Sequence, residues 1–419
     1  MNLKVCLAAA LVYALTTCCY GQNQFIKTYH VNDNSGLSDD SYYGRQTKLL
    51  KISQDLSNGL GLNAKALYER SRFNIKKSSD ILKLCGKPND DLCRQIRAGN
   101  DLIDNDVAGW ARGMDAVRQS MTAFIARNTG SDPQQIRIDL FANLGDLAAL
   151  SSMPTVSYRR TKGRFTLPVA WESILNPSAP PVPVVEVMIN GVLVPMVFDT
   201  GTDSVVIPKE LVGKLKLGGA HYDWMKSDQG KIVALGVAKT MNVGALHIEN
   251  MPVAILDTKV AIFGLSGIHL LKAIEMKNGV ITSDDAGFEK KCNDPMNMAS
   301  EAAGVSYLLT INGNTGGKTY SYFIDTGNAA KIRENIYGHP SDDENTQVSK
   351  IYLESQVEEV TTSTRSQVMQ IGDLPSSKIE YTAYFNDFHT QFKYEIGDSF
   401  LKPHDLIIDF DHGLTCLKQ

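Results

Sequence analysis

The chain has 419 residues with a formal net charge of -4, and 43% of its residues are hydrophobic. This length suits two or three domains, and the apolar content is ordinary for a globular protein. The nearly balanced charge excludes the polybasic surface that binds nucleic acids or anionic membranes, so neither is expected as a partner.

Residues 1–21 have the pattern of a secretory signal peptide. A positively charged start precedes an apolar run, Val5–Leu15, and small and polar residues follow it. The run is too short for a stable membrane span, and no later stretch is apolar enough for one. We therefore expect an exported protein, periplasmic or secreted. Cys18 offers the less favoured alternative of a lipid anchor and an outer-membrane lipoprotein, because Thr17 is a poor residue directly before such a cysteine.

Residues 25–152 are expected to form an α-helical domain. Apolar residues recur at three- and four-residue spacing in segments such as Asn63–Leu84 and Asp106–Arg127, which is the period of an amphipathic helix. The segment Asp132–Leu150 begins with an Asp-Pro start signal and continues the pattern. The region therefore predicts three to five helices.

Four cysteines lie beyond the signal segment, namely Cys85, Cys93, Cys292 and Cys416. An even number in an exported chain indicates disulfides, and four cysteines allow three pairings. We favour Cys85 with Cys93 and Cys292 with Cys416. The four are too scattered for a zinc site, so no metal is expected.

Residues 153–181 mark a change from helical to β-type sequence and predict a linker or edge strand. Leu175–Val185 contains four prolines, which excludes a helix there. The basic stretch Tyr158–Phe165 has two interpretations. One is a solvated segment or edge strand. The less favoured one is a processing site, which would make the helical domain a propeptide that masks a cleft.

The rest of the chain contains an internal repeat. Residues 182–281 and 305–419 predict two similar lobes, and residues 282–304 connect them. Each copy has a β-type run, an Ile-Asn-Gly turn signal and a second run that ends in Asp-Thr-Gly, at Asp199 and at Asp325. A β-rich middle follows in each copy, and then a glycine after two mainly apolar residues.

The repeated acids, Asp199 and Asp325, each follow an apolar strand. Brought together in a poorly solvated cleft, two carboxyl groups cannot both ionise cheaply, so the pair shares one proton and titrates as a unit. The ionised member then takes a proton from water, and the protonated member donates one to a carbonyl oxygen. This pattern predicts acid–base hydrolysis of an amide bond without a metal or cofactor.

The neighbours of both acids suit this role. Gly201 and Gly327 lack a Cβ, so each loop is free to turn sharply and to direct backbone N–H groups at the carboxylates. The threonine hydroxyls are able to bond across to the partner loop. The predicted dyad-supporting residues are Thr200, Gly201, Thr202, Thr326, Gly327 and Asn328.

Residues 182–418 resemble the retropepsin/pepsin-like aspartic proteases, and in particular bacterial single-chain forms with retroviral-type lobes. The two Asp-Thr-Gly motifs carry the resemblance, together with Ile-Phe-Gly ending at Gly264 and Glu-Ile-Gly ending at Gly397. The resemblance implies a mainly β, bilobal β-barrel fold with pseudo-twofold lobes, to which the helical domain is added. It implies that Asp199 and Asp325 are catalytic. It also implies that Gly264 and Gly397 support them from psi-loops packed behind the catalytic loops.

The same family has a mobile β-hairpin flap over its cleft. In the first copy this flap is expected within Tyr222–Gly236, with Tyr222 or Trp224 as a lid side chain. The equally weighted alternative is a surface hairpin with one exposed aromatic residue. In the second copy the flap is expected within Glu354–Ser366.

Two residues of the second copy depart from the family pattern. Asn328 stands where Ser, Thr or Ala is usual, although its amide is able to bond an Asp carboxylate, and Glu395 adds a charge to an apolar segment. The leading expectation is an exported, monomeric aspartic endopeptidase that cleaves an extended polypeptide. The alternative is a non-catalytic peptide- or protein-binding relative with a degenerate second lobe.

Overall fold

The computed structural model describes residues 14–15, 27–29, 35–54, 59–85, 90–173, 180–217, 222–226, 232–341, 344–352, 357–386 and 390–419. Of the predicted signal peptide, 1–21, only Ala14 and Leu15 are included. Cys18, the alternative lipid-anchor residue, lies outside the described residues. Within the described ranges, none of the helices combines the length and the apolar character needed to cross a membrane.

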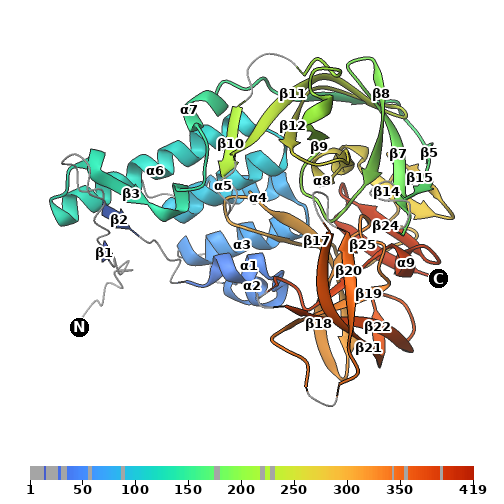
Figure 1. Cartoon of the computed structure of the whole chain (residues 1–419). Helices are drawn as coiled ribbons and strands as arrows, with labels where there is room; N and C mark the ends of the chain where they lie inside the picture. Colours follow the sequence, from blue (N-terminus) through green and yellow to red (C-terminus); the bar gives the residue numbers. More distant parts are fainter. Residues whose placement is uncertain are drawn as a thin grey trace.

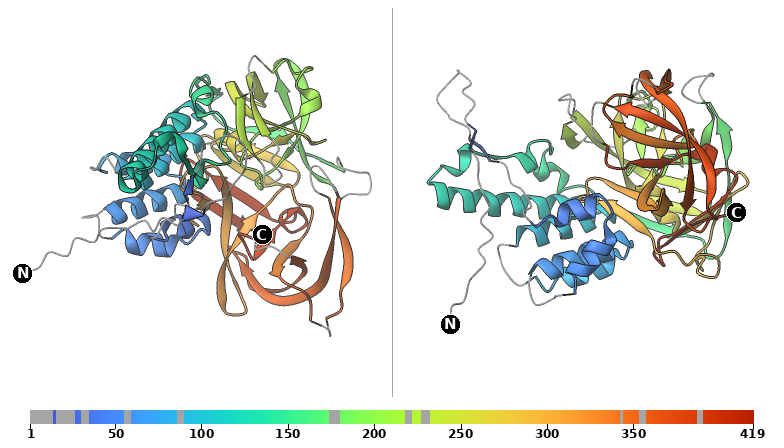
Figure 2. Two further views of the ribbon diagram at one scale, coloured as in Figure 1. Left: turned by 60° about the vertical axis from the view of Figure 1, so that its left-hand side comes forward. Right: turned by 90° about the horizontal axis from the view of Figure 1, so that it is seen from below.

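The chain forms a helical part and two β-rich lobes. Figure 1 shows the helices in blue and teal, the first lobe in green and the second in orange to red. In the two further views of Figure 2 the helices again lie to one side of the lobes. The predicted mainly β fold with an N-terminal helical part is confirmed. The closure of each lobe into a barrel stays a prediction.

Seven α-helices of the described residues make up the helical part, and three of them begin at Asp caps. They are α1 Leu37–Tyr42, α2 Gln46–Ile52, α3 Gly59–Ser71, α4 Ile75–Leu82, α5 Asp91–Ile103, α6 Val107–Thr129 and α7 Leu147–Leu150. The side chains of Asp90 and Asp106 accept backbone N–H groups at the starts of α5 and α6. Gly130, with φ 66°, ends α6 in the left-handed conformation that glycine favours.

The expected helix Asn63–Leu84 is in fact two helices, α3 and α4. The chain turns at Phe73, whose φ of 58° is incompatible with a continuous helix. The Phe73 ring packs against His269 and Phe410, with centroids 5.5 and 4.7 Å away. This contact with distant residues fixes a break that the local helical period does not reveal.

The segment 132–150, expected to be helical, is mostly not. It contains short 3₁₀ turns, η1 Pro133–Gln135 and η2 Asp139–Phe141, the strand β3 Ile136–Ile138, and only then α7. Ile136 and Ile138 are buried and the residue between them is exposed, which is the alternation of a strand. Strand β3 completes a small sheet with β1 Ala14–Leu15 and β2 Lys27–Tyr29.

Both lobes have the same strand order. The first contains β6 Ala170–Glu172, β7 Val182–Ile189, β8 Val192–Phe198, β9 Val206–Pro208, β10 Tyr222–Lys226, β11 Ile232–Val243, β12 Leu246–Leu256 and β13 Ile262–Phe263, with η3 Lys209–Leu211. The second contains β16 Asn297–Ser300, β17 Tyr307–Thr315, β18 Lys318–Ile324, β19 Ile332–Tyr337, β20 Gln347–Tyr352, β21 Val357–Ile371, β22 Ser377–Asn386 and β23 Tyr394–Ile396. The orders β6-β7-β8-β13-β9-β12-β11-β10 and β16-β17-β18-β23-β19-β22-β21-β20 are equivalent strand by strand. The internal repeat in the sequence therefore corresponds to two copies of one sheet.

The Ile-Asn-Gly signals behave differently in the two lobes. In the first, Asn190 and Gly191 have positive φ angles and form the tight turn between β7 and β8. In the second, β17 runs straight through Gly313, and the turn occurs at Gly316 and Gly317, also with positive φ. The expected turn at Gly313 is wrong because this residue pairs with β21 instead, and a side chain there would overlap Tyr322 and the backbone of β21.

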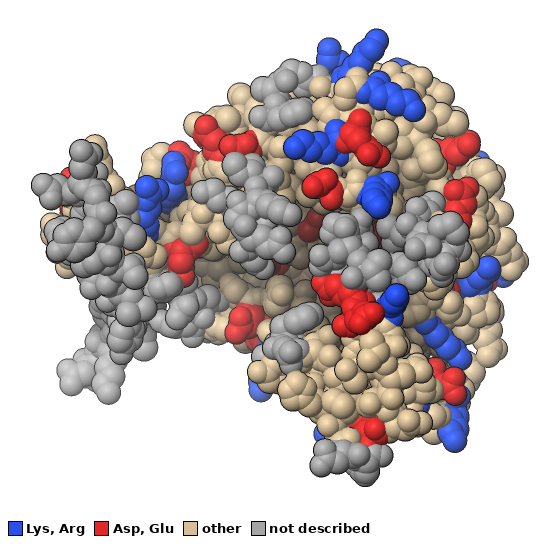
Figure 3. All heavy atoms as spheres, in the orientation of Figure 1, with Lys and Arg blue, Asp and Glu red and all other residues tan. Residues whose placement is uncertain are grey.

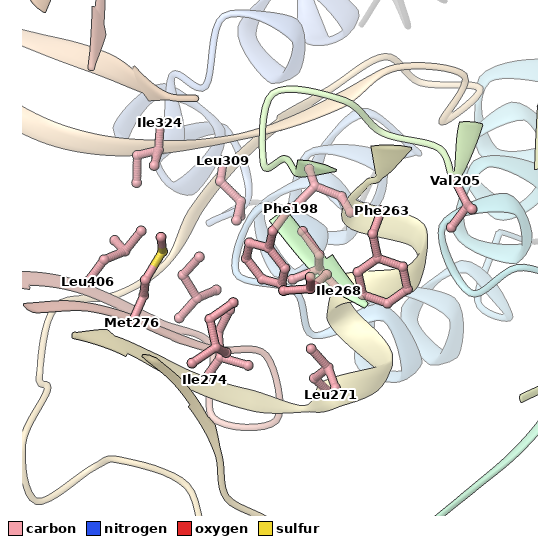
Figure 4. Close-up of a cluster of buried hydrophobic side chains, with 14 of the residues drawn as sticks. Phe198, Val205, Phe263, Ile268, Leu271, Ile274, Met276, Leu309, Ile324 and Leu406 are labelled. Carbon is pink, nitrogen blue, oxygen red and sulfur yellow. The ribbon is translucent and has the colours of Figure 1, made fainter. Parts of the chain in front are cut away.

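A five-stranded sheet joins the lobes. Its order is β25-β24-β14-β15-β5, with β5 Phe165–Pro168, β14 Ala273–Lys277, β15 Val280–Ser283, β24 Asp405–Asp409 and β25 Leu414–Lys418. The short helices α8 Leu265–Ile268 with η4 His269–Leu271, and α9 Asp398–Leu401, lead into it. Figure 4 shows that Phe198 and Phe263 of the first lobe, Ile274 of β14 and Ile324 of the second lobe belong to one buried cluster. Fully burying each such side chain contributes roughly 1.5–3 kcal/mol. Phe198 and Ile324 directly precede the two motifs, so the core that the lobes share lies next to the strand ends that carry them.

Both favoured disulfides are present in the structure, Cys85–Cys93 and Cys292–Cys416. The first joins the residues after α4 to α5. The second ties the segment between the lobes to β25 and is buried. Each bridge therefore closes a different part of the molecule.

The predicted linker, 153–181, contributes strands to the sheet of the first lobe and to the five-stranded sheet. Strand β4 Ser157–Arg160 pairs with β12, β5 with β15, and β6 with β7. The side chain of Arg160 is 4% exposed and lies 3.6 Å from Asp285. This placement favours the edge-strand interpretation of the basic stretch over a processing loop.

Candidate active site

The two predicted acids follow equivalent strands and meet between the lobes. Asp199 comes directly after β8 and Asp325 directly after β18. Each strand pairs with the short strand of its own psi-loop, β8 with β13 and β18 with β23. The Asp199 N–H donates to the carbonyl of Phe263 (3.2 Å), and the Asp325 N–H donates to the carbonyl of Ile396 (3.0 Å). Both acids are thus fixed at the backbone by matching hydrogen bonds.

Thr200 and Thr326 bind each other's loops reciprocally. Each backbone N–H donates to the other residue's hydroxyl, at 3.0 and 3.2 Å. Each hydroxyl donates to a carbonyl at the end of the partner strand, Thr200 to Ile324 (2.8 Å) and Thr326 to Phe198 (2.7 Å). Both threonines are fully buried, so these bonds are shielded from water and hold the two loops in register.

The carboxyl groups share a backbone donor. The Gly327 N–H lies 3.1 Å from Oδ1 of Asp199 and 3.0 Å from Oδ1 of Asp325. Asp199 also accepts the Gly201 N–H (2.7 Å) and the Thr202 hydroxyl (2.6 Å). A Cβ on either glycine would overlap the carboxyl group of the opposite lobe, so glycine is required at both positions.

The second lobe lacks the counterpart of the Thr202 bond. Asn328 stands at that position, and its amide donates to Glu395. The expectation that Asn328 bonds a catalytic carboxylate is therefore not met. Glu395 is 2% exposed and also pairs with Arg333. The extra charge noted in the sequence is thus neutralised locally, and its position redirects Asn328 away from Asp325.

The two acids are electrostatically unequal. Burial raises the pKa of Asp325 well above its ordinary value, and the nearby Asp199 and Glu395 raise it further, with Arg333 opposing them. Asp199 instead has three hydrogen-bond donors, which suit a carboxylate. The geometry therefore suits a pair in which Asp325 holds a proton while Asp199 is ionised.

The predicted psi-loop glycines pack directly behind the motifs. Gly264 lies against the carbonyls of Thr202 and Ser204, and Gly397 against those of Asn328 and Ala330, so a Cβ at either would overlap backbone. The residues after them donate N–H groups to the motif loops, Leu265 to Thr202 (2.8 Å) and Asp398 to Asn328 (2.6 Å). These contacts are equivalent in the two lobes.

Two acids near the pair were not singled out from the sequence. Burial, followed by Glu301 and Asp199, raises the pKa of Asp203 to about 6. Burial and the charge of Asp199 raise the pKa of Asp398 to about 9, and neither carboxyl oxygen of Asp398 has a hydrogen-bond partner among the described residues. Their positions in the sequence could have indicated both, because Asp203 lies four residues after Asp199 and Asp398 directly follows the psi-loop glycine Gly397.

The predicted flap of the first lobe is the hairpin β10–β11, and β20–β21 is its equivalent in the second lobe. Trp224 on β10 is 9% exposed, and its ring packs on Trp110 of α6 at 4.7 Å between centroids. The Gly145 N–H donates to the Trp224 carbonyl (2.7 Å). Tyr222 is half-buried beside the same cluster. The helical part thus holds the hairpin, and Trp224 does not project freely as a lid.

The helical part also covers an apolar wall of the first lobe. Val197, Val206 and Ile262 are 5%, 2% and 2% exposed and share a cluster with Trp110 of α6 and Leu147 of α7. Val197 directly precedes Phe198 on β8, and alternation places it on the strand face opposite the lobe core. Figure 3, in the orientation of Figure 1, shows a hollow in the surface between the helices and the lobes.

A small pocket of about 40 Å³ lies at this boundary, beside Asp203. It is lined by Leu102 and Val107 of the helical part, and by Trp224 and Tyr307 of the lobes. The Tyr307 hydroxyl donates to the Asp203 carbonyl (3.2 Å). The pocket is therefore a composite of all three parts of the chain.

Among the described residues, two groups of cysteine and acidic side chains are close enough together to hold a metal ion, and each contains a disulfide-bonded cysteine. They are Cys85, Asp90 and Cys93, and Asp294, Asp373 and Cys416. A sulfur in a disulfide is not a thiolate ligand, so neither group fits a metal.

Residues 185–270 match the family model described as aspartyl protease. No curated protein that was compared with the chain matches it. Similar solved structures include a basic 7S globulin from soybean, at 8% identity over 62% of this chain and 95% of that chain with a TM-score of 0.38. They also include a retropepsin-like aspartic protease from Rickettsia conorii, at 14% identity over 31% and 94% with a TM-score of 0.23. Another is conglutin gamma from lupine seeds, at 8% identity over 62% and 95% with a TM-score of 0.36. The resemblance predicted from the sequence is confirmed by the family model for residues 185–270, which match the aspartyl protease family.

Proposed function

We propose that the protein is an exported aspartic endopeptidase in which Asp199 and Asp325 form the catalytic pair. The observation that carries the proposal is the shared Gly327 N–H, which draws the two carboxyl groups from different lobes to one point. The matched threonine bonds hold them there. The family match of the first lobe supports a protease-like function.

In this mechanism Asp199 is the base and Asp325 the acid. Asp199 removes a proton from a water molecule as the water oxygen attacks the peptide carbonyl carbon, and Asp325 donates its proton to the carbonyl oxygen. A neutral tetrahedral diol results. Asp199 then passes its proton to the amide nitrogen while Asp325 recovers one from a hydroxyl, and the C–N bond breaks. The products are a carboxylic acid and an amine, and the shared proton is restored.

The proposed substrate is an extended polypeptide, whose backbone is able to pair with strand edges beside the site. One chain supplies both acids, which favours a working monomer. We propose the divisions 25–152 for the helical domain, 153–181 for the linker, 182–281 and 305–419 for the lobes, and 282–304 for the connector. The linker adds β6, and the connector adds β16, to the sheet of the lobe that follows. The two disulfides support export, to the periplasm or outside the cell.

The test is cleavage of an unfolded protein across a range of pH, with and without a pepstatin-type inhibitor. Asp199→Asn and Asp325→Asn should each abolish cleavage, while the exposed Asp257→Asn is the matched control and should retain it. Retained cleavage in either of the first two variants would contradict a shared site.

A second candidate function is peptide or protein binding without turnover. Two observations favour it: Asn328 bonds Glu395 instead of Asp325, and the helical part covers the apolar wall of the first lobe. Inhibitor or peptide binding without cleavage at any pH would support this candidate and reject the first.

A further inference from the structure

The second lobe replaces an apolar pair of the first lobe by an ion pair. In the first lobe, β9 and β13 place Val206 opposite Ile262. In the second, the equivalent strands β19 and β23 place Arg333 opposite Glu395. The two pairs occupy the same position in the repeated sheet, so the difference arises from residue type and not from backbone geometry.

The ion pair is well embedded. Glu395 is 2% exposed and accepts hydrogen bonds from Arg333 and from Asn328. The Arg333 guanidinium also lies over the Tyr384 ring, 5.3 Å from its centroid. A buried carboxylate with two donors has a fixed position, and it therefore fixes the side chain of Asn328 as well.

This arrangement removes a donor from one catalytic acid only. Thr202 donates to Asp199, but Asn328, its counterpart, donates to Glu395 and accepts the Ala330 N–H with its carbonyl oxygen (2.9 Å). Asp325 retains the Gly327 N–H among its donors. A second ionised carboxylate at Asp325 would therefore be less well stabilised than one at Asp199.

The acidic groups around Asp325 act in the same direction as the missing donor. Asp199 from the first lobe and Glu395 on β23 disfavour a negative charge there, and Arg333 on β19 partly offsets them. Asp398 on α9 is also affected by the charge of Asp199, which raises the pKa of Asp398. None of Glu395, Arg333 and Asp398 has a charged counterpart in the first lobe, where Ile262, Val206 and Leu265 stand at these positions.

We propose that Arg333, Glu395 and Asn328 form a positioning unit that makes the two halves of the site permanently unequal, so that Asp325 always carries the proton and Asp199 always acts as the base. The inference rests on the proposed function, because it assigns fixed roles within the same site. It goes further because it names three residues, other than the two acids themselves, that decide which acid is the base and which is the proton donor.

Two substitutions of opposite sign test it. Glu395→Gln removes a negative charge near Asp325 and leaves Arg333, so the alkaline limb of the pH profile of kcat/KM should move down by roughly one pH unit. Arg333→Gln leaves Glu395 without its partner, so the same limb should move up. Glu344→Gln, which removes a carboxylate elsewhere in the second lobe, is the matched control and should leave the limb in place.

A merely structural role would lower activity in both variants without opposite displacements of the limb. Displacement in one direction, or no displacement in variants that keep turnover, would overturn the proposal. If the single variants fold poorly, the double variant Arg333→Val, Glu395→Ile reproduces the residues of the first lobe, and hydrophobic replacement of a buried ion pair is often tolerated. With Asn328→Thr added, it should also move the limb down.

Carboxyl titration by ¹³C NMR separates the two hypotheses, because it does not require turnover. The Asp325 signal is identified by its loss in Asp325→Asn. If that signal titrates lower in Glu395→Gln and higher in Arg333→Gln but no peptide is cleaved, the positioning unit stands and the proposed hydrolysis fails. If peptides are cleaved and the signal is unchanged in both variants, hydrolysis stands and the positioning unit fails.

Discussion

Asp199 and Asp325, from different lobes, accept the same backbone N–H, that of Gly327, at 3.1 and 3.0 Å. One N–H group cannot serve two carboxyl groups unless they are close together. The two distances therefore show that the carboxyl groups of the two lobes lie close together. It also explains why the pair tolerates no side chain at Gly327.

The threonine bonds between the lobes predict a stability effect. Thr326→Val should lower the free energy of unfolding by about 1–3 kcal/mol, since it leaves the Thr200 N–H and the Phe198 carbonyl buried without their partner. Chemical denaturation would measure this. Thr326→Ser keeps the hydroxyl and is the control. A Thr326→Val variant as stable as the original chain would contradict the importance of these hydrogen bonds.

Asp398 predicts a pH dependence of stability. Its pKa is about 9 in the folded chain and near 3.8 when unfolded, so its contribution is fully present below pH 4 and is lost as the pH rises through 9. Asp398→Asn should remove this loss of stability. Between pH 4 and pH 8 the free energy of unfolding of the variant should rise by more than about 1.4 kcal/mol relative to that of the original chain, since one pKa unit corresponds to 1.36 kcal/mol. Urea denaturation at several pH values measures the gain. Parallel pH curves would argue against a buried, unpaired acid.

The contact between the helical part and β10 predicts a change in flap mobility. Gly145→Ala would place a Cβ on the Asp223 carbonyl and should push the loop before α7 away from β10. Faster hydrogen exchange in Tyr222–Lys226 is expected, together with a several-fold rise in kcat/KM if the helices restrict entry. A Cβ added by Gly213→Ala would have no atom of the described residues within 4 Å, so this variant should change neither quantity. Unchanged exchange in Gly145→Ala would mean that this contact does not hold the hairpin.

The disulfide Cys292–Cys416 predicts a difference between the two bridges. It closes a loop of 124 residues, whereas Cys85–Cys93 closes one of 8. Opening a longer loop increases the entropy of the unfolded chain more than opening a short one. The double variant Cys292→Ser, Cys416→Ser should therefore lose about 2–4 kcal/mol of unfolding free energy, and Cys85→Ser, Cys93→Ser should lose less. Thermal unfolding of both paired variants gives the comparison. The reverse order would contradict the entropic argument.

The features that sequence predicted well are local ones. The motif at Asp199 lies directly after an apolar strand, and its glycines and threonines are adjacent in the chain, so their backbone requirements are visible in a few letters. The same local pattern recurs at Asp325 in the second lobe. Disulfide pairing followed from the small number of alternatives.

The failures share a different cause. The break at Phe73 depends on packing against Phe410, and the straight course of β17 through Gly313 depends on pairing with β21. Both partners are far away in the chain, and local periodicity carries no information about them. The contact between Trp224 and Trp110 also joins distant residues, so local sequence did not indicate it.

The amino-acid sequence by itself determined the mainly β repeat, the helical N-terminal part and the identity of the two acids, because strand period, turn chemistry and the Asp-Thr-Gly motif are short-range properties. Only the tertiary structure decided that Asn328 bonds Glu395 and that the helices cover the wall around Val206. Side-chain hydrogen bonds and buried contacts form between groups that folding brings together. Which partner a side chain selects depends on the distances and burial that the finished fold imposes.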